Sequence, residues 1–294
     1  MKPSNNPKMY DSYVDFAGIK LSVDPINRKR TEDADNVMAI FYEEQPFTWE
    51  FIQPHIKDTL IKSKGEVDFL DVGCGSGIFG LLMAKNYSAN VIALDKSKRA
   101  IDFTTKNAEL NNLELVLNKE HYNLNSAPYE GVKVIGIYPP YHIYPNEVES
   151  KIPQHARGGS DGQGEFKNQL AIANNHLSQE GIIFFNQMCL GDNNGPNYLN
   201  YIPNLVKGNN SIYYTNVFQP IATIDFLKEV YGNDHHDFVK SISDNNPSLY
   251  YTVGIIKRNN KGIIKEITHN IDLKGRSWED RIKLHSEISR HSNL

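Results

Sequence analysis

Apolar runs and amphipathic segments alternate along most of the chain, beginning at residue 67. The run VDFLDVG at 67–73 ends in glycines, and IFGLLMAK at 78–85 has the spacing of a helix that buries one face. The same alternation predicts strands at 90–95, 113–118, 132–138, 182–188, 211–218 and 249–258, and helices at 99–110, 163–177 and 224–231. Alternating strands and helices form a largely parallel sheet with both faces covered. We therefore expect an α/β fold, a doubly wound, mostly parallel seven-stranded sheet of the Rossmann-like kind.

Two further segments flank this repeating pattern. Thr31 and the acidic residues after it predict a helix near 32–44, and Pro54 predicts the start of another, with Pro46-Phe47-Thr48 between them. The segment from Ser277 to Arg290 predicts a helix that packs on its own domain rather than on a second copy. The expected parts are a helical extension or substrate cover at 1–64, a central catalytic domain at 65–258 and a C-terminal extension with a helix at 259–294.

Charge and cysteine content narrow the classes of partner. The 294 residues include 31 basic and 35 acidic ones, so the net charge of −4 gives no positive field to attract nucleic acid or an anionic membrane. Two cysteines, Cys74 and Cys189, provide no disulfide framework. No signal peptide and no run of about 20 apolar residues is present. We expect a soluble, cytoplasmic protein, with nucleic acid an unfavoured partner; the sequence does not determine the oligomeric state.

A glycine-rich loop, Asp71-Val72-Gly73-Cys74-Gly75-Ser76-Gly77, joins the first strand of the alternation to its helix. Glycines let the backbone turn sharply and approach a ligand without a Cβ in the way. Gly75, Gly77 and Gly80 also match the G-x-G-x-x-G pattern of dinucleotide-binding proteins, and Asp95 follows at the distance that pattern requires. NAD is therefore the competing cofactor.

Two acids favour S-adenosylmethionine (SAM) over NAD. A carboxylate at Asp71 would repel a pyrophosphate at the helix N-terminus, whereas SAM carries an ammonium and a sulfonium that an acid attracts. Asp95, at the end of the second strand, is placed to accept hydrogen bonds from the ribose hydroxyls. The structural alternatives are an exposed loop cap for Asp71 and a helix N-cap for Asp95.

These segments also resemble a known family. VDFLDVGCGSGIFG resembles motif I of class I methyltransferases, VIALDKS resembles their second-strand acidic motif, and RAIDFTTKNAELNNLE resembles the helix that follows it in the small-domain group. That group includes the release-factor and ribosomal-protein glutamine methyltransferases, and the resemblance covers roughly residues 65–190. It implies that the cofactor is SAM and that the residues binding it are Asp71, Gly73, Cys74, Gly75, Gly77, Asp95 and Lys96.

The resemblance extends to an acceptor motif, Tyr138-Pro139-Pro140-Tyr141, after the fourth strand. Relatives carry Asn or Asp before Pro-Pro-Tyr, and there the amide oxygen and the carbonyl of the next proline hold the nitrogen to be methylated. The implied catalytic residues here are Tyr138, Pro139 and Tyr141. Because a phenol is larger than a carboxamide, Tyr138 cannot reproduce that clamp, and glutamine methylation is not inherited. A proline-rich turn without chemistry is the alternative.

Weaker parallels complete the expected site. GGSDGQGEF at 158–166 resembles a segment that follows the acceptor motif in the glutamine methyltransferases, and there we expect Asp161 to cap the next helix. For the adenine ring, the loop after the third strand offers Asn123, with Tyr122 second, although asparagine in a loop is more often a turn former.

Histidines give no metal signature. His142, His155 and His176 are scattered, and Asp234-His235-His236-Asp237 lacks the i, i+4 spacing of a strong metal motif. We expect no metal, and methyl transfer needs none.

The sequence therefore predicts a SAM-dependent methyltransferase acting most readily on a nitrogen of a protein or small-molecule acceptor. The alternatives are O- or C-methylation of a small metabolite, a nucleic-acid methyltransferase, a SAM-binding protein that has lost activity, and an NAD-dependent oxidoreductase.

Overall fold

The computed structural model describes residues 8–9, 13–24, 37, 40–61, 67–118, 129–259 and 261–291. The candidate adenine ligands Asn123 and Tyr122 lie outside these residues, as does most of the helix expected at 32–44. Within the described part of that helix, residues 42–44 form a turn instead.

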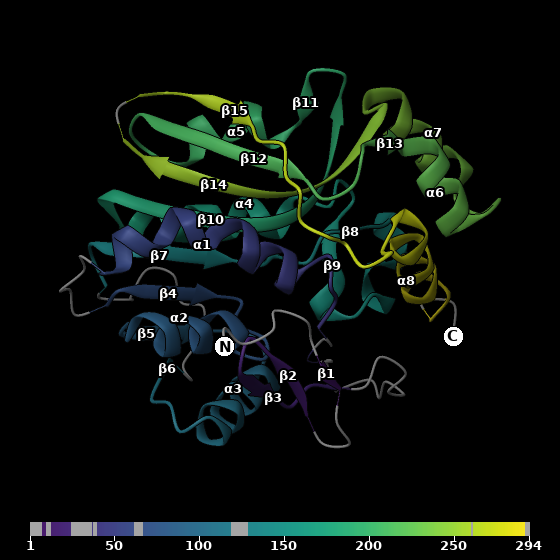
Figure 1. The fold of residues 1–294 in the computed structure, drawn as a ribbon. Coiled ribbons are helices and arrows are strands. Elements are labelled where there is room, and N and C mark those ends of the chain that lie inside the picture. The colour runs from purple at the N-terminus through teal and green to yellow at the C-terminus, as the bar shows by residue number, and fades with distance from the viewer. Residues whose placement is uncertain are drawn as a thin grey trace.

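The centre of the molecule is a twisted sheet whose path runs β15-β12-β14-β10-β7-β4-β5-β6 (Figure 1). These strands are β4 (Phe69–Val72), β5 (Val91–Leu94), β6 (Val116–Asn118), β7 (Val132–Ile137), β10 (Leu177–Asp192), β12 (Asn210–Asn216), β14 (Ser248–Arg258) and β15 (Ile264–Glu266). The five strands from β6 to β10 are parallel, and β14 runs antiparallel between β10 and β12. The predicted seven-stranded, mostly parallel sheet is confirmed, and β15 extends its edge beyond the prediction.

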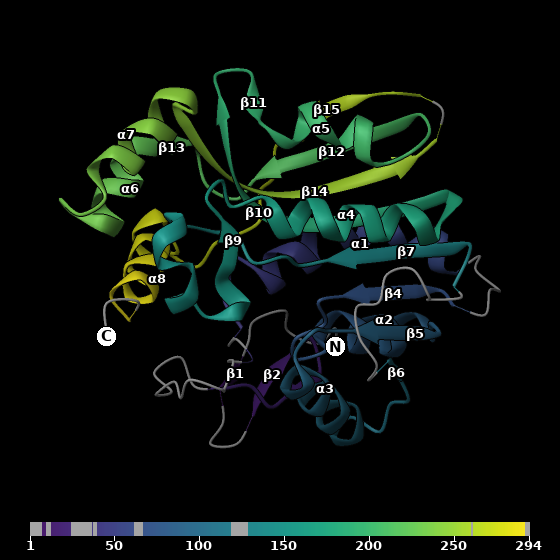
Figure 2. The ribbon, with the colours of Figure 1, turned by 180° about the vertical axis from the view of Figure 1, so that it is seen from behind.

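Helices cover both faces of the sheet, as Figures 1 and 2 show from opposite sides. The eight helices assigned in the described residues are α1 (Gln45–Ile61), α2 (Ile78–Tyr87), α3 (Lys98–Leu110), α4 (Gly164–His176), α5 (Tyr198–Leu205), α6 (Thr223–Tyr231), α7 (His236–Asn245) and α8 (Trp278–His291). Helices α1 and α2 pack on one face, and α4 and α5 pack on the other. Neighbouring strand residues alternate between these layers: Phe69 joins the first core and Leu70 the second.

The N-terminal region differs from the expected pair of helices. Three short strands, β1 (Lys8–Met9), β2 (Val14–Phe16) and β3 (Ile19–Leu21), form a separate antiparallel sheet. Helix α1 begins at Gln45, so Pro46 lies in its first turn and Pro54 lies inside it. The predicted break at Pro46 is wrong because a first-turn residue donates no intrahelical hydrogen bond, so proline is tolerated there. The predicted helix start at Pro54 is wrong because α1 already runs through that residue.

Several short elements were not predicted. Strands β8 (His142–Ile143) and β9 (Arg157–Gly159) pair in parallel, which brings the two ends of the 144–156 connection together. Two short 3₁₀-helices, Asn146–Lys151 and Gln154–Ala156, fill that connection. Strands β11 (Gly195–Pro196) and β13 (Ile221–Ala222) pair with β10 and β14. Helices α5 and α7 were also missed, because they have only 8 and 10 residues and α5 contains Pro203.

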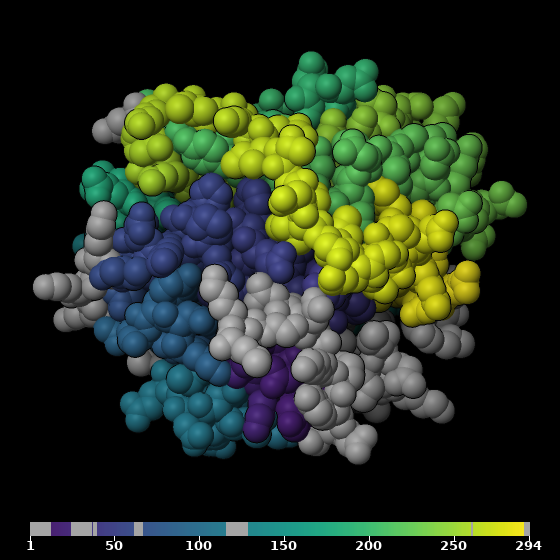
Figure 3. All heavy atoms as spheres, in the orientation of Figure 1, coloured from purple at the N-terminus to yellow at the C-terminus, as the bar shows by residue number. Residues whose placement is uncertain are grey.

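The C-terminal segment crosses the molecule and ends against its own domain. Figure 3 shows this segment in yellow, beside α1 and the region of α6 and α7. Helix α8 packs on α6, where Ser286 Oγ donates a hydrogen bond to the Glu229 carbonyl at 3.3 Å. The expected docking on its own domain is what the structure has. Across the described ranges, no helix is both long and apolar enough to span a bilayer.

Candidate functional site

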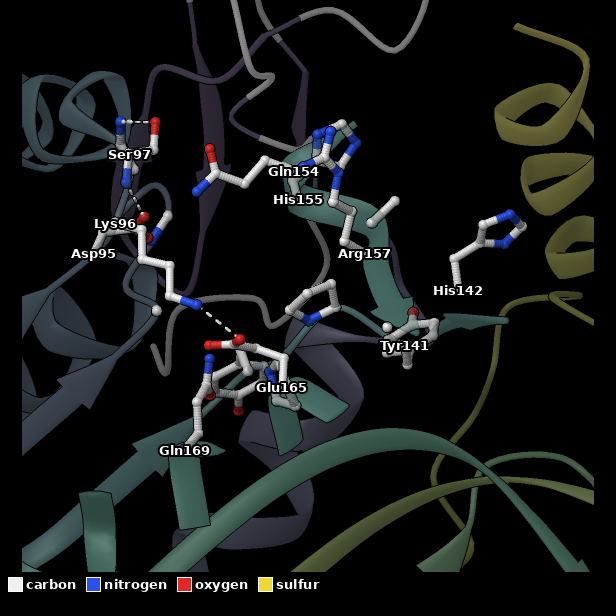
Figure 4. Close-up of a pocket in the computed structure, with 18 of the residues that line it drawn as sticks. Asp95, Lys96, Ser97, Tyr141, His142, Gln154, His155, Arg157, Glu165 and Gln169 are labelled. Atoms are coloured by element: carbon white, nitrogen blue, oxygen red, sulfur yellow. Dashed lines mark hydrogen bonds and ion pairs between the residues drawn. The ribbon is translucent and has the colours of Figure 1, made fainter. Parts of the chain in front are cut away.

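A cavity of about 730 Å³ opens at the carboxyl ends of the parallel strands (Figure 4). In open α/β sheets this edge is where ligands bind. The predicted site residues that line the cavity are Asp71, Gly73, Cys74, Gly75, Asp95, Lys96, Tyr138, Pro139 and Tyr141. Gly77, the last residue of the glycine loop, does not line it and forms the N-cap of α2.

The glycine loop adopts conformations that side chains disfavour. Gly73, Gly75 and Gly77 have φ angles of 79°, 54° and 78°. A Cβ on Gly77 would stand 2.6 Å from Thr104 Cγ2, whereas one on Gly75 would meet nothing within 4 Å. Thr104 Oγ1 also donates to the Gly75 carbonyl at 3.1 Å. Gly77 thus lets α3 approach the loop, and Gly75 leaves the space above the loop open.

Asp95 braces the loop and its own turn. Its Oδ2 accepts a hydrogen bond from the Gly75 amide at 2.9 Å, and its Oδ1 accepts one from the Ser97 amide at 2.8 Å. The N-cap of α3 is Ser97, whose hydroxyl accepts from the Ala100 amide at 3.3 Å. The alternative reading of Asp95 as the helix cap is therefore wrong; the carboxylate fixes the glycine loop against the end of β5.

Asp71 is buried, with 1 % of its surface exposed, so the alternative of an exposed loop cap is also wrong. Its Oδ2 accepts a hydrogen bond from the Gly80 amide at 3.1 Å. Its Oδ1 has no hydrogen-bond partner among the described residues. Burial raises the pKa of the carboxyl to about 7, against the Gly80 hydrogen bond, which lowers it, and with a smaller contribution from the Asp95 charge, which raises it.

Tyr138 contributes its ring to the cavity rather than its hydroxyl. The ring stacks on Phe79 with centroids 4.4 Å apart and meets the edge of Phe184 at 6.0 Å. The hydroxyl is buried and has no hydrogen-bond partner in the described part of the chain; Thr48 lies near it without the geometry of a bond. Burial, and next the Asp71 carboxylate, raise the pKa of this phenol well above its usual value. The phenol therefore stays neutral and forms part of an aromatic wall.

Tyr141 is held by an ion cluster that sequence reasoning missed. Its hydroxyl donates to Glu44 Oε1 and accepts from Arg281 Nη1 at 3.0 Å. Arg281 is fully buried and pairs with both Glu43 and Glu44. Arg276 adds a second guanidinium, 2.8 Å from Glu43 Oε2. The cluster joins α8, the turn before α1 and the Pro-Pro-Tyr motif, which are far apart in sequence.

Two histidines line the cavity beside Tyr141. His142 Nδ1 and His285 Nδ1 are 2.6 Å apart, and both residues are 2 % exposed. The His285 ring lies 5.9 Å from the ring of Tyr141. His142 directly follows the Pro-Pro-Tyr motif, a position that could have marked it, whereas nothing in the sequence pointed to His285.

The other histidines have separate places. His155 lines the cavity, and His176 hydrogen-bonds to the Tyr129 carbonyl at 2.6 Å. His235 pairs with Glu147 at 3.0 Å. Within the ranges that the structure describes, no three His, Cys, Asp or Glu side chains are grouped to hold a metal ion.

An ion pair crosses the cavity on the Asp95 side. Lys96 Nζ lies 2.7 Å from Glu165 Oε2, in the first turn of α4 (Figure 4). Asp161, expected to cap α4, instead accepts from the Gln163 amide at 2.8 Å and pairs with Lys167 at 2.9 Å. Helix α4 begins at Gly164 with Gln163 at its N-cap, so Asp161 lies two residues before the cap position.

The segment that contains the glycine loop is similar to known proteins. Residues 54–185 match the family model described as "Methyltransferase small domain", a family of class I SAM-dependent methyltransferases. The chain is 28% identical over 152 residues to the release factor glutamine methyltransferase of Flavobacterium psychrophilum (strain ATCC 49511 / DSM 21280 / CIP 103535 / JIP02/86). That alignment covers 48% of this chain and 53% of the relative, so the chain spans about half the length of the curated protein it matches.

Solved structures with similar backbones are distant in sequence. The geranyl diphosphate C-methyltransferase of Streptomyces coelicolor A3(2), in complex with S-adenosyl-L-homocysteine, is 13% identical with a TM-score of 0.44, over 87% of this chain and 95% of that one. A putative class I SAM-dependent methyltransferase of Listeria monocytogenes is 14% identical with a TM-score of 0.45, over 85% and 73%.

Proposed function

We propose that this chain transfers a methyl group from SAM to a nitrogen of a protein or small-molecule acceptor. The observation that carries the proposal is the buried Asp71 carboxylate, which has one oxygen held by the Gly80 amide and the other without a partner in the described chain, at the foot of an open glycine loop. A buried carboxylate oxygen without a partner is costly, and a cationic ligand group relieves that cost.

The residues around the loop fit SAM. The Oδ1 atom of Asp71 would accept from the ammonium group, and Gly75 leaves room for the ligand because its missing Cβ opens onto empty space. Asp95 would accept from the ribose hydroxyls while it continues to hold the Gly75 amide. We also assign Gly73, Cys74, Gly77, Lys96 and Asn123 to the cofactor side. When bound, SAM supplies an electrophilic methyl group on a sulfonium.

NAD fits the same loop less well. A pyrophosphate at the N-terminus of α2 would lie against the carboxylates of Asp71 and Asp95. Burial already raises the pKa of the Asp71 carboxyl, and two nearby phosphate charges would raise that pKa further.

On the acceptor side we assign Tyr138, Pro139 and Tyr141. The Pro139 carbonyl is a hydrogen-bond acceptor just after β7, and Tyr138 and Tyr141, close to it in the chain, also line the cavity. Catalysis would come from alignment of the nitrogen lone pair with the methyl group, since in-line displacement at a sulfonium needs no metal. Because the hydroxyl of Tyr138 is buried, it does not hold a nitrogen as the corresponding residue of the relatives does. O- or C-methylation, or loss of activity, are therefore the second candidate functions.

Calorimetric titration of the purified protein tests the cofactor assignment. SAM and S-adenosylhomocysteine should bind and NAD should not. Asp95→Ala should weaken SAM binding by about 1.5–3 kcal/mol, the usual value of hydrogen bonds to a charged group. Asp272→Ala, which changes an exposed carboxylate paired with Lys274, is the matched control. Binding of NAD without binding of SAM would reject the proposal.

The acceptor is found by incubating the protein and tritiated SAM with cell extract divided by molecular size. Label in the large fraction indicates a protein acceptor, and label in the small fraction indicates a metabolite. SAM binding without label in either fraction would favour the inactive SAM-binding alternative.

A further inference from the structure

Four residues form a row across the sheet where its parallel strands reach the cavity. The register sets four residues side by side on β5, β4, β7 and β10: Leu94, Val72, Ile137 and Phe185. The next residue along each strand gives the row, which in the same order is Asp95, Gly73, Tyr138 and Asn186. Neighbouring strands are about 4.8 Å apart, so Asn186 lies roughly 10 Å from Gly73. Asn186 therefore stands at the acceptor end of a row whose other end belongs to the cofactor loop.

The side chain of Asn186 is held in one orientation. Along β10, Phe184 and Met188 belong to the core under α1 and α2, and Asn186 points to that same face because strand residues alternate. Its Nδ2 donates a hydrogen bond at 3.1 Å to Oγ1 of Thr48, a fully buried residue of α1. A carboxamide is planar, with its oxygen and nitrogen on opposite sides of Cγ. The bond to Thr48 therefore also fixes where Oδ1 points.

The Oδ1 atom of Asn186 is open to the cavity. Among the described residues, no donor reaches it. Although the whole residue is only 2 % exposed, Oδ1 is not one of the buried oxygens without a partner, as the hydroxyl of Tyr138 is. Asn186 lines the cavity, so the exposed part of its surface faces that space. The row thus offers an oriented acceptor oxygen at Asn186 beside a phenol whose hydroxyl is turned away.

A second acceptor oxygen follows on the neighbouring strand. Pro139 comes directly after Tyr138 and lines the cavity, and its carbonyl takes part in no hydrogen bond within the described ranges. Both oxygens can only accept hydrogen bonds. They therefore fit a ligand group that donates.

We propose that Asn186 Oδ1 accepts a hydrogen bond from the nitrogen to be methylated. The inference rests on the proposed methyltransferase function and deepens it, by naming a substrate-binding residue outside the Tyr138–Tyr141 motif. It requires an acceptor nitrogen that carries at least one hydrogen, and it disfavours carbon acceptors.

Asn186 binds the nitrogen and leaves its proton to solvent. A neutral acceptor that holds the N–H group also orients the lone pair on the same atom. The new N–C bond forms as the S–C bond of SAM breaks, and the sulfur keeps the electron pair. The proton lost from the nitrogen then goes to water, because a carboxamide does not take it up.

Nitrogen-15 NMR of the Asn186 side chain tests the open oxygen without a natural substrate. Acetamide, which carries N–H groups, should shift the Nδ2 signal of the intact protein, and N,N-dimethylacetamide, which has none, should not. Asn186→Leu should lose acetamide binding at this site. Equal shifts with both probes, or no shift with either, would overturn the inference. The titration is done with and without S-adenosylhomocysteine, so this failure is distinct from failure of the proposed function.

Two substitutions separate hydrogen bonding from packing. Asn186→Asp keeps an acceptor oxygen, whereas Asn186→Leu keeps only a side chain of similar size. With tritiated SAM and cell extract, we expect Asn186→Leu to lose at least about tenfold in methyl transfer and Asn186→Asp to stay within about fivefold of wild type. SAM affinity should be unchanged in both. Equal activity of the two, or the reverse order, would refute a role in binding the acceptor.

Thr48→Val covers the case in which substitutions at position 186 prevent folding. Valine keeps the shape of threonine and removes the oxygen that orients the carboxamide, so methyl transfer should fall about two- to tenfold with SAM affinity retained. Thr223→Val, at another fully buried threonine that does not line the cavity, is the matched control and should leave methyl transfer unchanged. Full activity of Thr48→Val would count against an oriented Oδ1.

Discussion

The cofactor half of the cavity and its acceptor half are built from very different lengths of chain. Asp71, the glycine loop, Asp95 and Ser97 lie within 27 residues of one another and are joined by backbone amides. The acceptor half draws Glu44, Tyr141 and His285 from three distant segments and joins them through side chains. The cofactor half is fixed by contacts that are short in sequence, whereas the acceptor half depends on buried ion pairs between residues that are far apart in sequence.

The largest expected effect comes from removing the charge that unites the acceptor half. Arg281→Met leaves the buried Glu43 and Glu44 carboxylates with less compensation, so we expect a loss of about 3–5 kcal/mol in the free energy of unfolding. Urea denaturation measures it. Lys274→Ala, which breaks an exposed pair with Asp272, is the control and should leave the free energy of unfolding nearly unchanged. A small loss for Arg281→Met would mean that Arg276 alone compensates Glu43.

A glycine pair gives the corresponding test of the cofactor half. Gly77 and Gly131 have the same φ of 78°, but a Cβ would clash with Thr104 only at Gly77. Gly77→Ala adds that clash to the backbone strain, and we expect it to cost about 1–3 kcal/mol more than Gly131→Ala in thermal unfolding. SAM affinity should fall only in the Gly77 variant. Equal losses would show that the loop and α3 yield easily.

The pH dependence of SAM binding tests whether the cofactor half needs an ionised Asp71. Burial raises the pKa of Asp71 from 3.8 to about 7, so the carboxyl gains its proton as the pH falls through 7. Because the ammonium of SAM prefers the ionised form, affinity should fall below pH 7 by up to about tenfold per unit. Calorimetry between pH 5.5 and 8 measures the slope. Asp71→Asn should bind more weakly at pH 8 and lose this slope; a slope that persists in the variant would assign it to another group.

The smallest expected effect is at Tyr138. Its hydroxyl is buried without a partner in the described structure, so Tyr138→Phe should leave the free energy of unfolding unchanged or raise it by less than about 1 kcal/mol. Tyr138→Ala removes the stacking on Phe79 and should cost about 3–5 kcal/mol. If the phenylalanine variant is destabilised instead, the hydroxyl has a hydrogen bond, and the assignment of its ring alone to the wall is wrong.

The same contrast explains what the sequence could predict. Strand periodicity located the seven main strands, because the apolar runs are nearly continuous and strands such as β4, β5 and β10 are buried on both faces. The glycines and the two acids located the cofactor half, because their roles depend on neighbours close in sequence. His285 and Arg281 could not be found this way, since a helix with mixed polarity looks the same whether its polar residues face solvent or a buried partner.

The position of Tyr138 could be predicted from the sequence, but the direction of its side chain could not. The sequence placed it where β7 ends, and the resemblance to the methyltransferases implied a catalytic role for it. The stacking on Phe79 turns the hydroxyl into the interior, and that packing depends on α2, which the motif does not include. Position along a strand was predictable, whereas side-chain direction depended on a tertiary contact.

The pairing of Arg281 with Glu43 also bears on the order in which the protein forms during synthesis. These residues are 238 positions apart, so the acceptor half cannot close until nearly the whole chain has left the ribosome. The segment from β4 to α3 needs no such wait, since its contacts are short in sequence. A nascent chain that is released early would therefore have the glycine loop before it has any means of holding a methyl acceptor.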